Sequence, residues 1–111
     1  IRDSLEETKL ESFIKNADFV ITGEGRLDGQ TVMGKAPIGV AEIAKKYEKK
    51  VLAFGGCVAE DATLCNQHGI DAFFPILRTI TTLKEAMDFN HAKENLSAAV
   101  EQVFRLIQSF K

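Results

Sequence analysis

Three short apolar runs alternate with longer amphipathic segments along the chain. Residues 18–22, 51–54 and 72–74 are rich in β-branched and aromatic side chains, and each run ends at glycine or proline, which is typical of short buried strands. The segments around them repeat apolar residues at three- and four-residue spacing, as amphipathic helices do. Helices are therefore predicted at residues 4–16, 37–50, 61–68, 82–89 and 91–110.

This order of elements predicts the fold class α/β. Strands that alternate with helices favour a parallel sheet with right-handed crossovers, so we expect a three-layer Rossmann-like or flavodoxin-like sheet with flanking helices. Three short strands make a small sheet with exposed edges. We therefore expect an incomplete domain whose missing strands come from another segment or subunit. The chain also starts at Ile1 rather than at methionine, which adds to this expectation.

Composition narrows the classes of function. The 111 residues include 14 Lys and Arg against 16 Asp and Glu, so no face can carry the positive charge of a nucleic-acid binder. The 45% hydrophobic content argues against disorder. No apolar run approaches the roughly 18 residues of a membrane span. Two cysteines eight residues apart and two histidines match neither a zinc site nor a disulfide scaffold. We expect one cytoplasmic domain with reduced thiols.

Residues 23–36 form the segment that can carry chemistry, and we predict a long loop there. Five of the eight glycines lie between Gly23 and Gly39. The segment leaves the carboxyl end of the first strand, where α/β sheets bind ligands. It ends at a helix N-terminus, whose free N–H groups attract anions. We therefore expect a phosphate or carboxylate site. Its charged and polar side chains are Glu24, Arg26, Asp28, Thr31 and Lys35.

Known phosphate-binding motifs fit this segment poorly. Gly29 to Lys35 matches the G-x4-G-K part of a Walker A loop, but Ala36 stands where Ser or Thr would hold Mg²⁺.

Glu24 and Asp28, four residues apart, could hold Mg²⁺ together with substrate phosphates, or one of them could act as general base on a hydroxyl. The alternative is that Arg26 pairs with one of these carboxylates and simply ties the loop down.

The same stretch resembles the bacterial type I branch of the glycerate kinase family. That family has a run of the form ADxVITGEGRxDxQTxxGKxPxGVA. The likeness continues more loosely through residues 51–56, 67–72 and 82–86. It covers essentially the whole chain but only the last third or so of a family member. The residues that match the run are Ala17 to Asp28, Gln30-Thr31, Gly34-Lys35, Pro37 and Gly39-Val40-Ala41.

The resemblance implies an enzyme that uses ATP and Mg²⁺ to transfer the γ-phosphoryl group to a hydroxyl of D-glycerate, which gives a phosphoglycerate. It also implies a two-domain kinase, in which residues 1–111 form the C-terminal part of a Rossmann-like domain built from both ends of the chain. The main partner would then be the remainder of the parent kinase, although exposed sheet edges would also allow a homodimer. We expect the isolated chain to be inactive.

Roles for the loop residues follow from this resemblance. Asp28 is predicted to be the general base or a Mg²⁺ ligand, and Glu24 is the other candidate for either task. Lys35 and Arg26 are predicted to neutralise a phosphate or the glycerate carboxylate. The alternative is a non-catalytic α/β module that binds a ligand or assembles with a partner. The residues predicted to bind substrate are Glu24, Gly25, Thr31 and Gly34.

Overall fold

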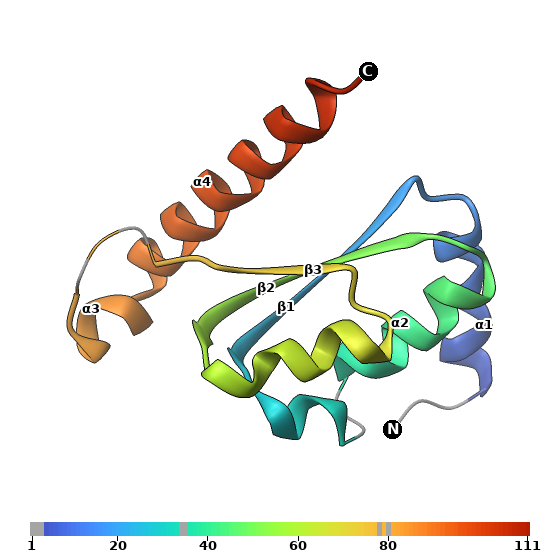
Figure 1. Ribbon diagram of the computed structural model, residues 1–111, viewed down its shortest axis with the longest axis horizontal. Coiled ribbons are helices and arrows are strands. Elements are labelled where there is room, and N and C mark those ends of the chain that lie inside the picture. The colour runs from blue at the N-terminus through green and yellow to red at the C-terminus, as the bar shows by residue number, and fades with distance from the viewer. Residues whose placement is uncertain (1–3, 34–35, 78, 80) are drawn as a thin grey trace.

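The computed structural model describes residues 4–33, 36–77, 79 and 81–111. Its centre is a three-stranded parallel sheet in the order β1 (Phe19–Leu27), β2 (Lys50–Val58) and β3 (Ala72–Pro75). The register places Val20 opposite Val51, and Leu52 opposite Ala72. Helices lie on both sides of this sheet (Figure 1). The predicted α/β class with a parallel sheet and flanking helices is therefore confirmed.

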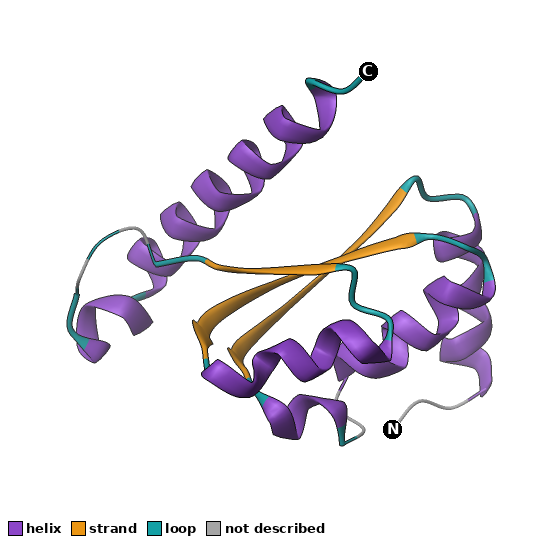
Figure 2. Cartoon of the chain, in the orientation of Figure 1, coloured by secondary structure: helices purple, strands orange, loops and turns teal. Residues whose placement is uncertain are grey.

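One face of the sheet is covered by the helices that precede and connect the strands. These are α1 (Ser4–Lys15), the short 3₁₀ turn η1 (Gly29–Val32), α2 (Ala36–Lys46) and the 3₁₀ helix η2 (Glu60–His68). Figure 2 shows these helices gathered below the strands. Their apolar side chains and those of β1 and β2 form the larger core. Its buried members are Ile14, Val20, Leu27, Ile38, Ala41, Ile43, Ala44, Val51, Ala53, Ala62, Cys65 and Ile70.

The opposite face is covered by α4 (Phe89–Gln108), which follows the short helix α3 (Leu83–Met87). Val103 of α4 packs on Leu52 and Phe54 of β2, and Phe54 stacks on Phe74 with ring centroids 5.5 Å apart. The predicted apolar stripe of this helix is confirmed at its centre. Phe110, the last residue of the predicted helix over residues 91–110, is 83% exposed. That residue follows the end of α4, where the helix has left the strands (Figure 1).

The sequence prediction places the ends of β1 and β2 too early. It ends the first strand at residue 22 and the second at residue 54, but the strands continue to Leu27 and Val58. Glycine has a low strand propensity by itself, but here the two glycine-containing segments pair with each other, and tertiary pairing decides. The predicted loop over residues 23–36 is therefore wrong in its first part. Residues 23–27 are strand, and residues 29–32 form a 3₁₀ turn.

The helices predicted after β2, over residues 61–68, 82–89 and 91–110, are confirmed with small changes. Gly69 ends η2 in the left-handed conformation with φ of 98°, as expected of a C-cap glycine, although the helix is 3₁₀ rather than α. Thr82 caps α3 by accepting a hydrogen bond from the N–H of Glu85. Asp88 caps α4 through the N–H of His91, so that helix begins two residues before the predicted start.

Asp71 joins three elements just before β3. Its carboxylate accepts hydrogen bonds from the N–H of Val51, at 2.7 Å, and from the ammonium of Lys45 on α2. Its own N–H donates to the carbonyl of Val51 at 3.0 Å. Burial opposes ionisation of Asp71, but the hydrogen bonds from Lys45 and Val51 outweigh it, and the pKa of this carboxyl lies below its ordinary value. The ionised form therefore stabilises the fold.

We predict that Asp71→Ala lowers the free energy of unfolding by about 1–2 kcal/mol at pH 7, since the side chain is a third exposed and solvent weakens its ion pair. Because the folded pKa is depressed, this contribution is present at neutral pH and is lost as the pH falls through the folded value, below about 4. Urea unfolding at several pH values should show the wild type and Asp71→Ala converging in acid. Asp71→Asn, which keeps an acceptor, should lie between them at pH 7. A difference that stays constant down to acid pH would contradict the assignment.

Candidate functional site

The carboxyl ends of β1 and β2 approach each other closely at two glycines. A Cβ atom added at Gly56 would lie 2.9 Å from the carbonyl oxygen of Gly25, closer than real Cβ contacts. In a regular strand, side chains that are seven residues apart face opposite sides of the sheet. Val20 and Leu27 have this spacing, and yet both belong to the core beside α2. The alternation of side chains along β1 therefore shifts by one residue in its carboxyl half. Glycine permits this kink. At their carboxyl ends the two strands therefore expose backbone atoms with few side chains over them.

Asp28 fixes the corner at which the chain leaves β1. Its Oδ1 accepts the N–H of Gln30 at 2.9 Å, and its Oδ2 accepts Nε–H of Arg26 at 2.9 Å. Thr31 is fully buried, and its hydroxyl accepts the N–H of Asp28 at 3.1 Å. Asp28 and Thr31 thus form a capping box around η1. The ion pair that the sequence analysis kept as an alternative, between Arg26 and a loop carboxylate, is present.

Arg26 on β1 lies opposite an exposed thiol on β2. The register pairs Arg26 with Cys57, and Nη1 of Arg26 lies 3.6 Å from the sulfur. The hydrogen bond to Asp28, followed by the charges of Cys57 and Asp28, raises the pKa of Arg26 above its ordinary value. Cys65, by contrast, is buried beneath η1, and burial raises the pKa of its thiol. The site therefore contains a permanent positive charge at the strand ends.

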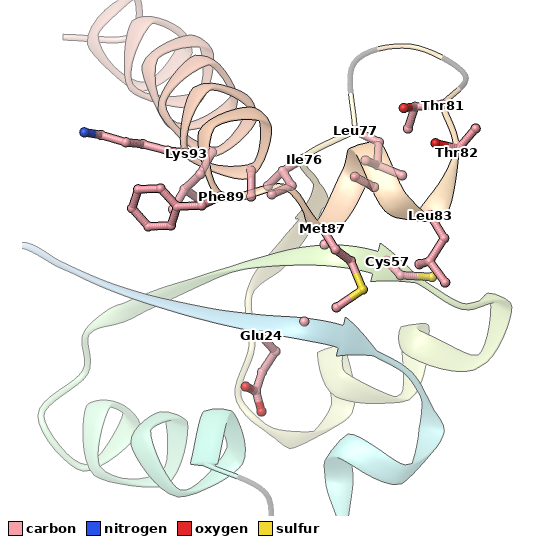
Figure 3. Close-up of a pocket in the computed structure, with 15 residues that line it drawn as sticks. Glu24, Cys57, Ile76, Leu77, Thr81, Thr82, Leu83, Met87, Phe89 and Lys93 are labelled. Atoms are coloured by element: carbon pink, nitrogen blue, oxygen red, sulfur yellow. The ribbon is translucent and has the colours of Figure 1, made fainter.

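Glu24 differs from Asp28 in its surroundings. Its side chain is partly buried on β1, and in Figure 3 the carboxylate points away from Met87 and Leu83. Within the described part of the chain, the Glu24 carboxylate makes no hydrogen bond or ion pair. One acidic side chain of the motif is thus held by neighbours, whereas the other is open to a ligand.

A groove of about 880 Å³ lies on the α4 side of the same strand ends. Its floor is the backbone at Gly25 and Gly56, and its walls come from the segment after β3 and from α3 and α4. The volume is in the range of small-molecule sites. Figure 3 shows the Leu83 side chain directed toward Cys57 and the Met87 side chain directed toward the strands. The apolar side chains that line it are Ile76, Leu77, Leu83, Met87, Phe89 and Leu96.

The sequence analysis did not identify this groove. Leu83 and Met87 have helical spacing and are more than 70% exposed, but the same spacing is typical of a helix that faces a core. The available signal was that the predicted helix at residues 82–89 was too short to bury its own apolar face. Only the position of α3 beside the strand ends distinguishes a groove wall from a core helix.

The structure brings five of the predicted site residues into one segment, and two lie outside its described residues. Glu24, Gly25 and Arg26 are on β1, while Asp28 and Thr31 bracket η1. Gly34 and Lys35 fall in the part that is not described. In the described ranges there is no group of three or more His, Cys, Asp or Glu side chains that could hold a metal ion, and no helix long and apolar enough to cross a membrane.

Comparison with known proteins places this site in a family. Residues 3–108 match the family model described as the glycerate kinase family. The chain belongs to the glycerate kinase family. It is 43% identical over 103 residues to glycerate kinase of Haemophilus influenzae, and 47% identical over 94 residues to glycerate 2-kinase of Escherichia coli K12. The resemblance seen in the sequence is thereby confirmed.

These relatives are much longer than this chain. The two alignments cover 93% and 85% of the chain but only 27% and 24% of the relatives. A crystal structure assigned to glycerate kinase 2 of Salmonella typhimurium LT2 superposes with a TM-score of 0.64 at 40% identity, and it covers 91% of this chain and 24% of that one. The chain thus spans about a quarter of the length of the glycerate kinases that it matches.

We predict that alanine destabilises the fold at one of the two strand-end glycines and has little effect at the other. Gly56→Ala should lower the free energy of unfolding by about 1–3 kcal/mol, because its Cβ must push β1 and β2 apart. Gly25→Ala is the matched control: no atom lies within 4 Å of its added Cβ, so stability should change by less than about 0.5 kcal/mol. Urea unfolding measures both. A Gly56→Ala variant as stable as the wild type would show that the close approach is not required.

Proposed function

We propose that this chain is part of a glycerate kinase, an enzyme that transfers the γ-phosphoryl group of ATP to a hydroxyl of D-glycerate. The family match over residues 3–108 carries this proposal. The site supports it, since the matched motif lies at the carboxyl end of a parallel sheet, where α/β enzymes bind ligands. Residues 1–111 would form the C-terminal part of a Rossmann-like domain, acting in the cytoplasm together with the remainder of the kinase.

The proposed reaction sets three tasks for the protein. The hydroxyl oxygen of glycerate bonds to the γ-phosphorus while the bond from that phosphorus to the bridging oxygen breaks, which releases ADP. The hydroxyl proton must pass to a base. Because such transfers depend mainly on positioning and charge stabilisation, the protein must also neutralise the phosphates and orient glycerate. Among the described residues, Arg26 and Glu24 suit two of these tasks.

Arg26 is the described group that suits an anion. Its Nε is engaged by Asp28, and the guanidinium has further N–H donors for a carboxylate or phosphate. Its side chain is 59% exposed, so a ligand can reach it. We propose that Lys35 adds a second positive charge beside the helix N-terminus and that Gly34 lets the backbone approach the substrate. These two roles rest on the sequence motif alone.

Glu24 is our choice for the proton acceptor or Mg²⁺ ligand. Asp28 accepts hydrogen bonds on both oxygens, which favours a role in positioning Arg26 and η1 over one in proton transfer. Thr31 is buried against the N–H of Asp28, so its effect on substrate would pass through Asp28. Mg²⁺ usually takes one or two carboxylates plus substrate phosphates. The carboxylate of Glu24 would therefore suit a metal that arrives with ATP, and the metal would supply charge neutralisation. Gly25 would leave room for the substrate beside the strand.

A chimera tests the proposed function. Residues 3–108 would replace the matched quarter of the Haemophilus influenzae glycerate kinase, and ATP-dependent phosphorylation of D-glycerate would be measured by ADP release. We expect turnover by the chimera, none by the 111-residue chain, and at least a tenfold loss of kcat in Glu24→Gln. Lys35→Ala should likewise lower kcat/KM about tenfold or more.

Glu42→Gln is the matched control, because Glu42 is an exposed acid on α2 with no part in the site. It should keep the activity of the unmodified chimera. A folded chimera without turnover would contradict the kinase function. Normal kcat in Glu24→Gln, together with a large loss in Asp28→Asn, would transfer the acid–base role to Asp28.

A further inference from the structure

The groove between α3, α4 and the strand ends has apolar walls. Among the described residues that line it, Glu24 and Lys93 are the charged ones. The side chains of Leu83, Met87 and Phe89 are each more than 70% exposed there. Apolar side chains that gather in a hollow and stay open to water commonly mark a place where a ligand or a partner binds.

The hydroxyl groups at the start of α3 are already engaged within the protein. Thr81 donates its hydroxyl hydrogen to the Glu85 carboxylate at 2.7 Å, and the hydroxyl oxygen of Thr82 accepts the N–H of Glu85 at 3.2 Å. These bonds hold the first turn of α3. A ligand on this wall therefore gains mainly from contact with apolar side chains, as a flat aromatic ring does.

A positive charge lies where the groove meets the strand ends. Cys57 belongs to its lining, and Nη1 of Arg26 lies 3.6 Å from the Cys57 sulfur. Asp28 engages Nε of Arg26 and offsets part of its charge, but the guanidinium keeps further N–H donors and is 59% exposed. The Glu24 carboxylate points away from the α3 side chains (Figure 3). The groove therefore combines apolar walls with an anion-binding group at one end.

The two substrates of the proposed reaction differ in how well they suit this groove. D-Glycerate carries a carboxylate or a hydroxyl on each of its carbons, and apolar walls would remove water from these groups without replacing their hydrogen bonds. ATP has a flat ring system with apolar faces at one end and a polyphosphate anion at the other. That combination matches apolar walls beside a guanidinium group. Of the two substrates, the groove therefore favours ATP.

We propose that the groove between α3 and α4 binds the adenine ring of ATP, with the polyphosphate directed at Arg26. Leu83 and Met87 of α3 contact the ring. The proposal rests on the proposed function for the identity of the nucleotide. The phosphates then reach Glu24 from the α4 side of the strands. D-Glycerate accordingly lies on the side to which the Glu24 carboxylate points, away from Leu83 and Met87 (Figure 3).

The exposed thiol of Cys57 tests the proposal directly, because it belongs to the groove. In the chimera described above, Cys57 should react with iodoacetamide, whereas Cys65 is buried and should not. Saturating ATP or AMP should slow alkylation of Cys57 at least about fivefold, since the bound nucleotide covers the thiol. Ribose 5-phosphate, which lacks the base, and D-glycerate should change the rate by less than about twofold. Mass spectrometry of the peptide that contains Cys57 measures each rate.

Equal alkylation of Cys57 with and without ATP overturns the proposal, as does protection by ribose 5-phosphate or D-glycerate that equals the protection by AMP. If Cys57 reacts in the 111-residue chain but not in the ligand-free chimera, the remainder of the kinase fills the groove and the proposal is wrong. Protection by AMP in a chimera that cannot phosphorylate D-glycerate supports the groove and refutes only the kinase function. Turnover in a chimera whose Cys57 stays unprotected does the reverse.

A charge on the α3 wall tests the same groove through kinetics of the chimera. Met87→Glu places a carboxylate against the ring, so KM for ATP should rise at least about tenfold while KM for D-glycerate stays within about threefold. Leu106→Glu is the matched control, because Leu106 is an exposed residue of α4 outside the groove, and both constants should stay within about threefold. An unchanged KM for ATP in folded Met87→Glu, or an equal rise in Leu106→Glu, overturns the proposal. The alkylation test needs no variant and decides the question if Met87→Glu does not fold.

Discussion

The close approach of β1 and β2 at Gly25 and Gly56 is the constraint on which the site depends. Because Gly56 has no Cβ to meet the carbonyl of Gly25, the two strands stay paired past the point where their apolar runs stop, and β1 shifts its alternation before Leu27 returns to the core. Arg26 then lies opposite Cys57, and the chain turns sharply at Asp28. The first part of the glycine-rich motif, residues 23–27, is therefore strand rather than a loop that folds around a ligand. Side chains on β1 such as Glu24 and Arg26 are therefore held on a rigid element, as the roles proposed for them would require.

The capping box at Asp28 fixes the turn by which the chain leaves β1 and enters η1. Thr31 is the one fully buried polar side chain in the described core, and its hydroxyl has a partner, so burial carries no unmet hydrogen bond. Asp28 meanwhile offsets the charge of Arg26 without removing its remaining donors. The two carboxylates of the motif thus differ in their contacts. Asp28 holds Arg26 in place, and Glu24 is left open to solvent and ligand.

Sequence reasoning succeeded where local rules decide the structure. The apolar runs located the three described strands, the helices after β2 lie close to their predicted ranges, and the parallel order followed from the alternation of elements. It failed where partners distant in the chain decide. Strand propensity ends β1 at Gly23, because no local signal shows that Gly55 and Gly56 lie alongside. The groove between α3 and the strand ends was missed for the same reason. Leu83 and Met87 are exposed because α4 does not cover this part of the strand ends, which the local sequence does not show.

The two faces of the sheet also differ in how complete they are, and this difference bears on function. The face beside α1 and α2 has a continuous core of twelve buried residues, whereas only Leu52, Phe54 and Val103 are buried beneath α4. Ile21 and Phe89 stay exposed around the second face, and the apolar groove opens there. A fold of this kind is held together by one layer and leaves the other available for assembly. The glycerate kinases that this chain matches are about four times longer, so most of their length lies outside the segment whose less buried face is described here.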